Sequence, residues 1–368
     1  MTTSILYYFI GKCLVMDDNP EARRLVEAEV SSGNMPWEEF VWMGSSHFVL
    51  PALFSAFKRN GLLPLLPTDL IEHLSGIYSL NLNRNHQIIE QAHDLIRILK
   101  SEGIEPVFLK GAGHLLQNLY RDPGDRIMSD IDILMPEGDI QKAAQLLYEN
   151  GYSHPEEFKD DDFEMHHHLP GFEHKRYVAM VELHNAIFPE KYQKIVSNAE
   201  IYGGKKKIEG FDAFVLSVNH QRVLNFVHDQ LINEEFKYKI MLVKGLYDFY
   251  LLAKLYPSIS IKPIIKGYER KFNSYCSFVS STFNNSQNIS FNENPSTRRF
   301  KRQFDYLLNH PKTHKIHQLI VLYSLRVTLI LKTFITAPFS KHSRRYIKKK
   351  VGTWSAVKRY FRHLRQEF

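Results

Sequence analysis

The segment FLKGAGHLLQNLYRDPGDRIMSDIDILMP, residues 108–136, is the most informative part of this 368-residue chain. It begins at the end of a short apolar run, residues 105–109, which we interpret as a strand before a glycine-containing turn. Residues 114–120 favour a helix, and Asp122-Pro123-Gly124-Asp125 is a strong turn signal. Residues 127–135 then alternate with period two and predict a second strand.

Asp130 and Asp132 lie on one face of this predicted strand, between aliphatic neighbours. Carboxylates at positions i and i+2 are roughly 7 Å apart along a strand and can ligate one or two hard cations such as Mg²⁺. Residues 177–184 also alternate with period two and predict a later strand. Glu182 is a polar position of this strand and is the candidate third carboxylate. The alternative is that Asp130 and Asp132 are solvent-facing residues, but aspartate fits poorly in mid-strand, and such conflicts are typical of functional sites.

Lys110-Gly111-Ala112-Gly113 predicts a cradle for a triphosphate. Its glycines permit close backbone approach, the helix that follows offers free N–H groups, and Lys110 adds a cation. The Walker A pattern GxxxxGK[ST] does not occur. Arg126 either contacts phosphate or solvates the turn, and both interpretations stay open. Ser129, beside Asp130, completes the candidate nucleotide-binding residues.

The pattern LKG…Y…R…DIDIL over residues 109–134, followed by LH at residues 183–184, resembles an uncharacterised bacterial nucleotidyltransferase family. That family is part of the polymerase-β-like nucleotidyltransferase superfamily, and the resemblance covers about residues 80–190. It implies an α+β core with a short mixed sheet. It also implies that Asp130, Asp132 and Glu182 bind Mg²⁺ or Mn²⁺ and catalyse transfer of a nucleoside monophosphate from an NTP to an unknown acceptor.

The sequence departs from the superfamily at the phosphate turn, where Lys110-Gly111 stands in place of the usual Gly-Ser pair. Gly111 also lies 19 positions before Asp130, a longer spacing than usual.

Helical patterns flank this core on both sides. Periodic apolar residues predict helices over residues 21–30, 50–59, 69–80 and 83–102, then a helix over 140–148 that ends at Asn150-Gly151, and helices from 213 to about 256. A polar stretch, residues 280–297, predicts a connector, and two more helices follow. We therefore divide the chain into an N-terminal helical region, the core, a C-terminal helical region and a basic amphipathic tail: residues 1–82, 83–205, 206–337 and 338–368.

Positive charge is concentrated at the C-terminus. Residues 341–368 contain ten Lys or Arg and one acid, whereas residues 1–340 carry a net charge of −2. The charge distribution therefore does not support a nucleic-acid-binding surface over the whole protein, and the tail is the candidate contact with an anionic membrane or nucleic acid. The alternative is that the apolar stripe of the tail, Trp354 to Leu364, packs on the rest of the protein.

The remaining composition favours a cytoplasmic protein, with the membrane periphery as the alternative. Cys13 and Cys276 are the only cysteines, which excludes a disulfide scaffold and a cysteine-cluster zinc site. The start of the chain lacks a secretory signal. Residues 319–335 are apolar but contain Arg326 and Lys332, so we expect a buried or interfacial helix and no transmembrane span.

Two other functions stay open. His228-Asp229, with His184, His220 and Asp248 elsewhere, permits a metal-dependent phosphohydrolase of the HD type. The fold can also serve as a non-catalytic module that binds nucleotide, RNA or a partner, although the intact carboxylates favour catalysis. The histidine-rich loop near residues 160–168 joins the two carboxylate strands and is a candidate lid.

Overall fold

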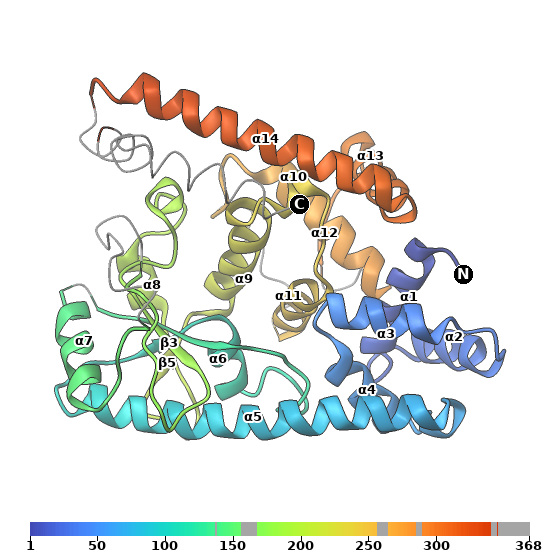
Figure 1. Cartoon of the computed structure of the whole chain (residues 1–368), viewed down its shortest axis with the longest axis horizontal. Helices are drawn as coiled ribbons and strands as arrows, with labels where there is room; N and C mark the ends of the chain where they lie inside the picture. The colour runs from blue at the N-terminus through green and yellow to red at the C-terminus, as the bar shows by residue number, and fades with distance from the viewer. Residues whose placement is uncertain (137, 156–167, 256–263, 285–288, 340–343, 345–368) are drawn as a thin grey trace. The chain divides into compact units, whose positions relative to one another are not determined.

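The computed structural model describes residues 1–136, 138–155, 168–255, 264–284, 289–339 and 344. The chain divides into two compact units, residues 1–236 with 240–309, and residues 237–239 with 310–368. Helices and one small mixed sheet form the first unit, which confirms the α+β prediction (Figure 1). The tail beyond residue 344 and nearly all of the predicted lid, residues 156–167, lie outside the described residues.

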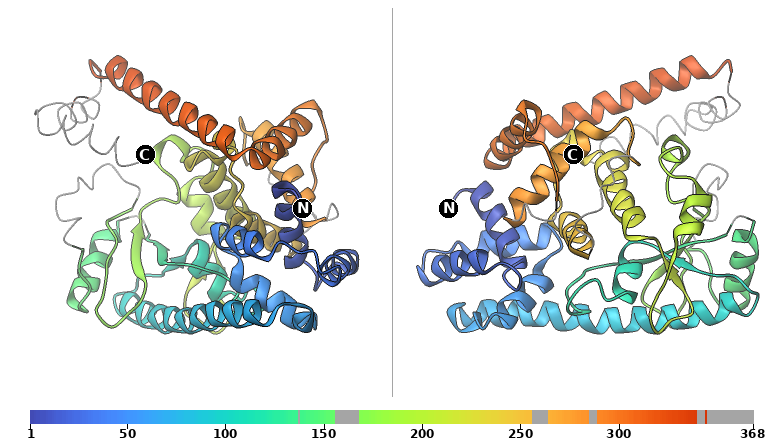
Figure 2. Two further views of the ribbon diagram at one scale, coloured as in Figure 1. Left: turned by 45° about the vertical axis from the view of Figure 1, so that its right-hand side comes forward. Right: turned by 180° about the vertical axis from the view of Figure 1, so that it is seen from behind.

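Helices precede the sheet, as expected, and the bounds are α1 Thr3–Leu14, α2 Pro20–Ser31, α3 Trp37–Ser46, α4 Leu50–Arg59, the short 3-10 helix Leu63–Leu65, and α5 Thr68–Lys100. The two helices expected over 69–80 and 83–102 are one continuous helix of 33 residues. The separate-helix prediction was wrong because the junction, Leu-Asn-Leu-Asn at 80–83, contains neither proline nor glycine to stop the helix. Helix α5 runs past both α4 and the sheet region (Figures 1 and 2).

The sheet contains β1 Val107–Phe108, β2 Asp130–Leu134, β3 Met180–His184, β4 Lys206–Lys207 and β5 Phe214–Val215. Their order is β3-β2-β1-β5-β4, with β2 parallel to β3 and antiparallel to β1, and β5 parallel to β1 and antiparallel to β4. The predicted strands exist but are shorter than their patterns. Strands β4 and β5 were not predicted, because two residues are too few to show alternation.

Helix α6, Lys110–Leu116, begins earlier than expected. Lys110-Gly111-Ala112-Gly113 is therefore the first turn of a helix and not a separate turn before it. Lys110 itself has φ 42°, the left-handed region that non-glycine residues rarely adopt. Helix α7, Ile140–Glu149, matches its prediction and is followed by the expected Asn150-Gly151.

Helices cover the remainder of the first unit: α8 Asn198–Gly204, α9 Val218–Val227, a π-helical turn His228–Ile232, α10 Glu235–Tyr238 (which crosses into the second unit), α11 Val243–Leu255, α12 Glu269–Phe283 and α13 Pro295–Asn309. A 3-10 turn, Glu190–Tyr192, precedes them. The polar connector is shorter than predicted, since residues 280–283 end α12 and residues 295–297 begin α13. Polar side chains do not prevent helix formation when the helix has an apolar face to bury.

Two hydrophobic cores stabilise the first unit. One contains the aliphatic residues of β2 and β3, such as Ile131, Ile133 and Val181, packed against Leu95 and Leu99 of α5. The other is formed by the N-terminal helices with α9, α11, α12 and α13. Every second residue of β2 is thus fixed in a core, which directs the intervening aspartates the other way.

The second unit contains helix α14, Pro311–Thr336. It is the one described helix long and apolar enough, by length and composition alone, to cross a membrane. We expected it to be buried or interfacial. The prediction of a buried helix is wrong, because Thr333 is the single buried residue of α14.

Candidate active site

Strand pairing brings the two carboxylate-bearing strands together. In the parallel pair β2–β3, Asp132 lies opposite Glu182 and Leu134 lies opposite His184. The Asp132 side chain is 3% exposed, whereas that of Glu182 is 26% exposed. An alternating pattern on each strand therefore places two acids and a histidine on adjacent positions of one sheet.

Asp132 is the centre of a charged cluster. His184 Nε2 is 2.7 Å and Lys110 Nζ is 3.3 Å from Asp132 Oδ1, and His184 Nε2 is 3.5 Å from Glu182 Oε2. Burial opposes ionisation of Asp132, but Lys110 and His184 outweigh it and hold the pKa of the carboxyl well below its usual range. Burial likewise opposes the charge of Lys110, whose pKa is nevertheless raised by Asp132, Asp130 and Glu182.

The donor set fits a divalent cation. Oxygen or nitrogen atoms of Asp132, Glu182 and His184 all lie within 4.8 Å of one another. Carboxylate oxygens suit Mg²⁺ and Mn²⁺, and Mn²⁺ accepts imidazole nitrogen more readily than Mg²⁺ does. Asp130, also predicted as a ligand, is not among these three residues. It is half-buried, and burial together with the charge of Asp132 raises the pKa of Asp130.

A cavity of about 260 Å³ opens beside the two aspartates. One wall, which we call the sheet wall, contains the predicted residues Lys110, Gly111, Arg126, Ser129, Asp130 and Asp132. Glu182 and His184 reach Asp132 from the neighbouring strand and are not part of the lining formed by the described residues. All four candidate nucleotide-binding residues thus share a cavity with two of the three candidate metal ligands.

Arg126 is held by a buried acid and does not solvate the turn. Its Nη2 and Nε lie 2.8 and 3.0 Å from the two carboxylate oxygens of Asp248 in α11, which also accepts a hydrogen bond from Tyr120 at 2.6 Å. Burial opposes the charge of Asp248, but Arg126 and His114 hold the pKa of this carboxyl below its usual range. A Cβ on Gly111 would lie 2.3 Å from Arg126 Nη1, so glycine leaves room for the guanidinium.

Polar residues of α5 position the segments that lead into both carboxylate strands. Asn81 and Asn85 each donate to the backbone carbonyl of Arg126, at 3.1 and 2.8 Å. Arg84 donates to the carbonyls of Met128 and Val178, and Gln91 donates to that of Ala179. One rigid helix therefore holds the start of β2 and the start of β3 in register.

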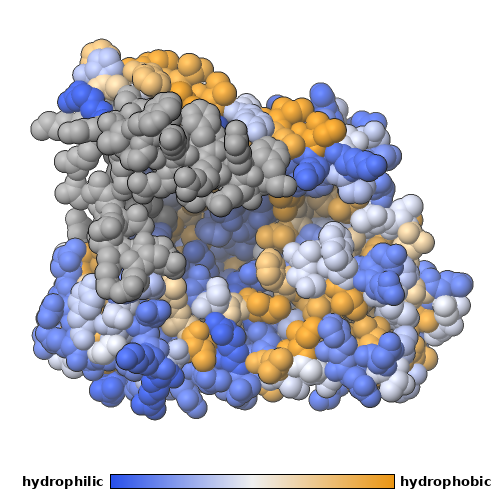
Figure 3. All heavy atoms as spheres, in the orientation of Figure 1, coloured by the Kyte–Doolittle hydropathy of each residue, from blue (hydrophilic) through white to orange (hydrophobic). Residues whose placement is uncertain are grey.

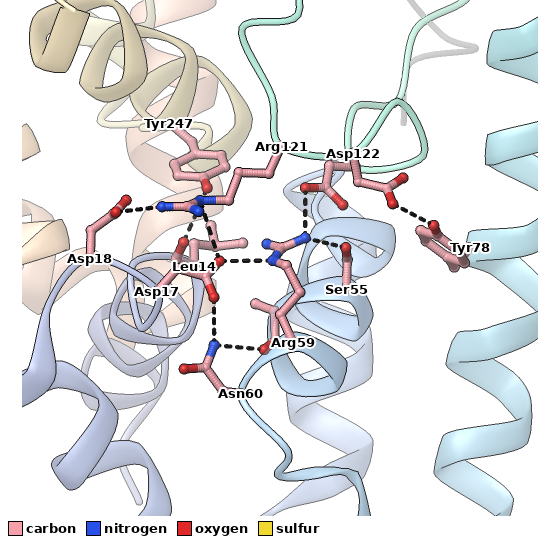
Figure 4. A network of polar contacts seen from close by, with 12 residues as sticks. Leu14, Asp17, Asp18, Ser55, Arg59, Asn60, Tyr78, Arg121, Asp122 and Tyr247 are labelled. Atoms are coloured by element: carbon pink, nitrogen blue, oxygen red, sulfur yellow. Dashed lines mark hydrogen bonds and ion pairs between the residues drawn. The ribbon is translucent and has the colours of Figure 1, made fainter.

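The Arg121–Asp125 turn is tied to the N-terminal helices by a second polar network (Figure 4). Arg121 pairs with Asp18 at 2.5 Å, and Asp122 accepts a hydrogen bond from Tyr78 at 2.9 Å. Arg59 bridges Asp17 and Asp125, at 2.8 and 3.3 Å. These contacts hold the turn against the N-terminal helices, while Asp248 of α11 holds the Arg126 side chain that follows the turn.

The opposite side of the cavity, which we call the helical wall, comes from α9, the π-helical turn, α10 and α11. It includes Asn225, His228, Asp229, Glu235 and Lys244. His228 Nδ1 lies 3.0 Å from Asp229 Oδ1. Burial and the charge of Arg126 lower the pKa of Lys244. Among the described residues, the group with metal-ligand spacing is the strand cluster and not this His-Asp pair.

Three residues complete this arrangement that sequence reasoning did not place in the carboxylate site: His184 and Asp248 were named as site residues only for the phosphohydrolase alternative, and His114 was not named as one. His184 was visible as the last polar position of a strand that already carried Glu182, and alternation put the two on one face. Asp248 and His114 gave no local signal, since their roles depend on a contact between α11 and α6 that no spacing encodes.

A comparison with curated proteins found no match to the chain, and neither did a comparison with solved structures. A family model does match, over residues 33–263, a range that includes α4 to α11, the sheet and both walls of the cavity. The match covers more than half of the chain, which belongs to the family described as uncharacterised nucleotidyltransferase.

Proposed function

We propose that the protein transfers a nucleoside monophosphate from an NTP to an acceptor hydroxyl or phosphate and releases pyrophosphate. The observation that carries this proposal is the pair Asp130 and Asp132 at a cavity, with Glu182 in register on the neighbouring strand. Family membership supports the reaction class.

Asp130, Asp132 and Glu182 would hold Mg²⁺ or Mn²⁺, with His184 as an additional ligand or as the group that orients Asp132. When bound, such a cation polarises phosphoryl oxygens and stabilises the charge of the leaving pyrophosphate. Lys110 would bind the triphosphate by its ammonium group, and Ser129 and the backbone at Gly111 would contact it. Arg126 would add positive charge from its fixed position against Asp248.

The helical wall is the side from which we expect the acceptor to approach. Asp229 is oriented by His228 and could take the proton from an acceptor hydroxyl as its oxygen bonds to the α-phosphorus. The bond from that phosphorus to the bridging oxygen then breaks and pyrophosphate leaves. The family match includes this wall as well as the sheet wall.

Labelled NTPs incubated with the protein, Mn²⁺ or Mg²⁺ and a cell extract test this proposal. We expect pyrophosphate release and a labelled product larger than the nucleotide, both lost in Asp130→Asn and Asp132→Asn. Release of inorganic phosphate or of a free nucleoside monophosphate, sensitive to His228 and Asp229 but not to Asp130, would instead support the phosphohydrolase. Nucleotide binding without turnover under every condition would support a binding module.

A further inference from the structure

Helix α14 exposes apolar residues along one face, which we call the α14 stripe, and Figure 3 shows patches of apolar atoms over this helix. Large apolar residues recur at positions i, i+4, i+7, i+11, i+15 and i+18, which is the spacing of one helix face. They are between 44% and 64% exposed: Ile316, Ile320, Tyr323, Val327, Leu331 and Phe334. A solvent-exposed apolar surface of this kind marks an interaction site.

Two contacts of α14 inside its own unit come from histidines off the stripe. His314 Nε2 lies 3.0 Å from the carbonyl oxygen of Tyr238, and His317 Nε2 lies 2.9 Å from that of Lys237. These contacts orient the first turns of the helix, and within the described part of the chain the stripe residues stay exposed.

Charge identifies the kind of partner. Residues 310–368 contain fourteen Lys or Arg and a single acid, Glu367. Helix α14 itself carries Lys312, Lys315, Arg326 and Lys332 and has no acid. Two copies of so basic a segment would repel each other. Binding to an anionic surface, in contrast, is stabilised by about 1 kcal/mol for each nearby Lys or Arg.

The length of α14 permits two modes of membrane contact. Its 26 residues extend about 39 Å, enough for a hydrocarbon layer of about 30 Å. Spanning would place Arg326 in the middle of that layer and Lys332 within it, at a cost of about 2.5–3.5 kcal/mol for a charge at the centre. A helix that lies in the interface buries the stripe and keeps both charges at the lipid headgroups.

We propose that helix α14 lies in the surface of an anionic phospholipid bilayer, with the α14 stripe among the acyl chains and the basic residues at the headgroups. This inference is independent of the proposed nucleotidyl transfer, because α14 lies outside the matched family region and shares no residue with the cavity. Membrane attachment would restrict the enzyme to acceptors present at that surface.

Co-sedimentation of the full chain with phosphatidylcholine vesicles, with and without phosphatidylglycerol, tests the proposal. We expect binding to the anionic vesicles only, and weaker binding at high salt. The variant Ile320→Asp with Val327→Asp should lose about tenfold or more in affinity, because two apolar side chains leave the bilayer. The matched control is Ser324→Asp with Thr328→Asp, two exposed residues off the stripe that add the same charge.

The control should lose much less affinity than the stripe variant. Circular dichroism of both variants would show that each retains its helical content. Equal losses in the two variants would overturn the proposal, since attraction would then be purely electrostatic. Equal binding to neutral vesicles, resistance to extraction by alkaline carbonate from native membranes, or a stripe-dependent dimer in light scattering without vesicle binding would also overturn it.

Discussion

Lys110 combines backbone strain with a charge directed at the site. Its φ of 42° is unfavourable for any residue with a Cβ by roughly 1–2 kcal/mol, and its ammonium group lies 3.3 Å from Asp132. Such strain is typical of functional positions. The two properties can be separated by mutation because glycine removes both and alanine removes only the charge.

Lys110→Ala and Lys110→Gly should therefore weaken NTP binding equally, whereas the glycine variant should be more stable than the alanine variant by about 1 kcal/mol. Calorimetric titration with an NTP and chemical denaturation measure the two effects. Equal stability of the variants would contradict the strained backbone. Unchanged NTP affinity in both would contradict the triphosphate role of Lys110.

Gly111→Ala tests the contact between α6 and Arg126. The added Cβ would lie 2.3 Å from Arg126 Nη1, so the guanidinium must move away from its place against Asp248. We expect a loss of about 1–3 kcal/mol in the free energy of unfolding, together with weaker nucleotide binding. Gly203→Ala is the matched control, because a Cβ there meets open space in helix α8. Similar stabilities of the two variants would show that Gly111 is not needed for this packing.

Asp248 joins α11 to α6 and to the segment before β2. Asp248→Asn would leave the buried guanidinium of Arg126 without its counter-ion and should cost about 3–5 kcal/mol. Because the folded pKa of Asp248 is lowered, the wild-type contribution is present at neutral pH and is lost as the pH falls below about 4. Urea unfolding at pH 7 measures the cost, and Arg126→Met in the same background should recover part of it. A cost below 1 kcal/mol would mean that the pair does not join these elements.

Glu235, in α10 at the helical wall, gives a second pH prediction. Burial and the charge of Asp229 raise the pKa of Glu235 to about 9, whereas an unfolded glutamate titrates near 4.3. Between about pH 5 and 9 the folded state therefore keeps a proton that the unfolded state has released, so stability falls as pH rises. The thermal midpoint of the wild type should decrease across this range more steeply than that of Glu235→Gln. Parallel curves would contradict a protonated Glu235.

Some strands and helices could be predicted from the sequence, and others could not. Alternation predicted β2 and β3 and the face that carries Asp130, Asp132 and Glu182. The direction of side chains in a strand repeats every two residues, whatever the surroundings of the strand are. It could not predict β4 and β5, each two residues long and stabilised by pairing rather than by pattern. The turn at Lys110 was predicted from its glycines, but packing against Arg126 and β2 makes it the first turn of α6.

For the whole molecule, local patterns predicted the sheet side of the site and missed its other half. The helical wall comes from residues 225–248, which reach Lys110 and Asp130 through the packing of α9 against α6 and of α11 against α9. The His228-Asp229 pair suggested a separate activity in the sequence, yet it lines the same cavity as the carboxylates. The assignment of domains at residues 82, 205 and 337 stays a prediction, although β4 and β5 extend the sheet beyond residue 205.

We propose that Asp132 belongs to a metal-dependent nucleotide site, which can be tested by titration of Mn²⁺ in the presence of an NTP. We predict that the wild type binds Mn²⁺ with the nucleotide and that Asp132→Asn loses this binding while it stays folded. Asp69→Asn, an exposed acid in the first turn of α5, should bind as the wild type does. Equal Mn²⁺ and NTP binding by Asp132→Asn and the wild type would show that Asp132 is not part of a metal-dependent nucleotide site.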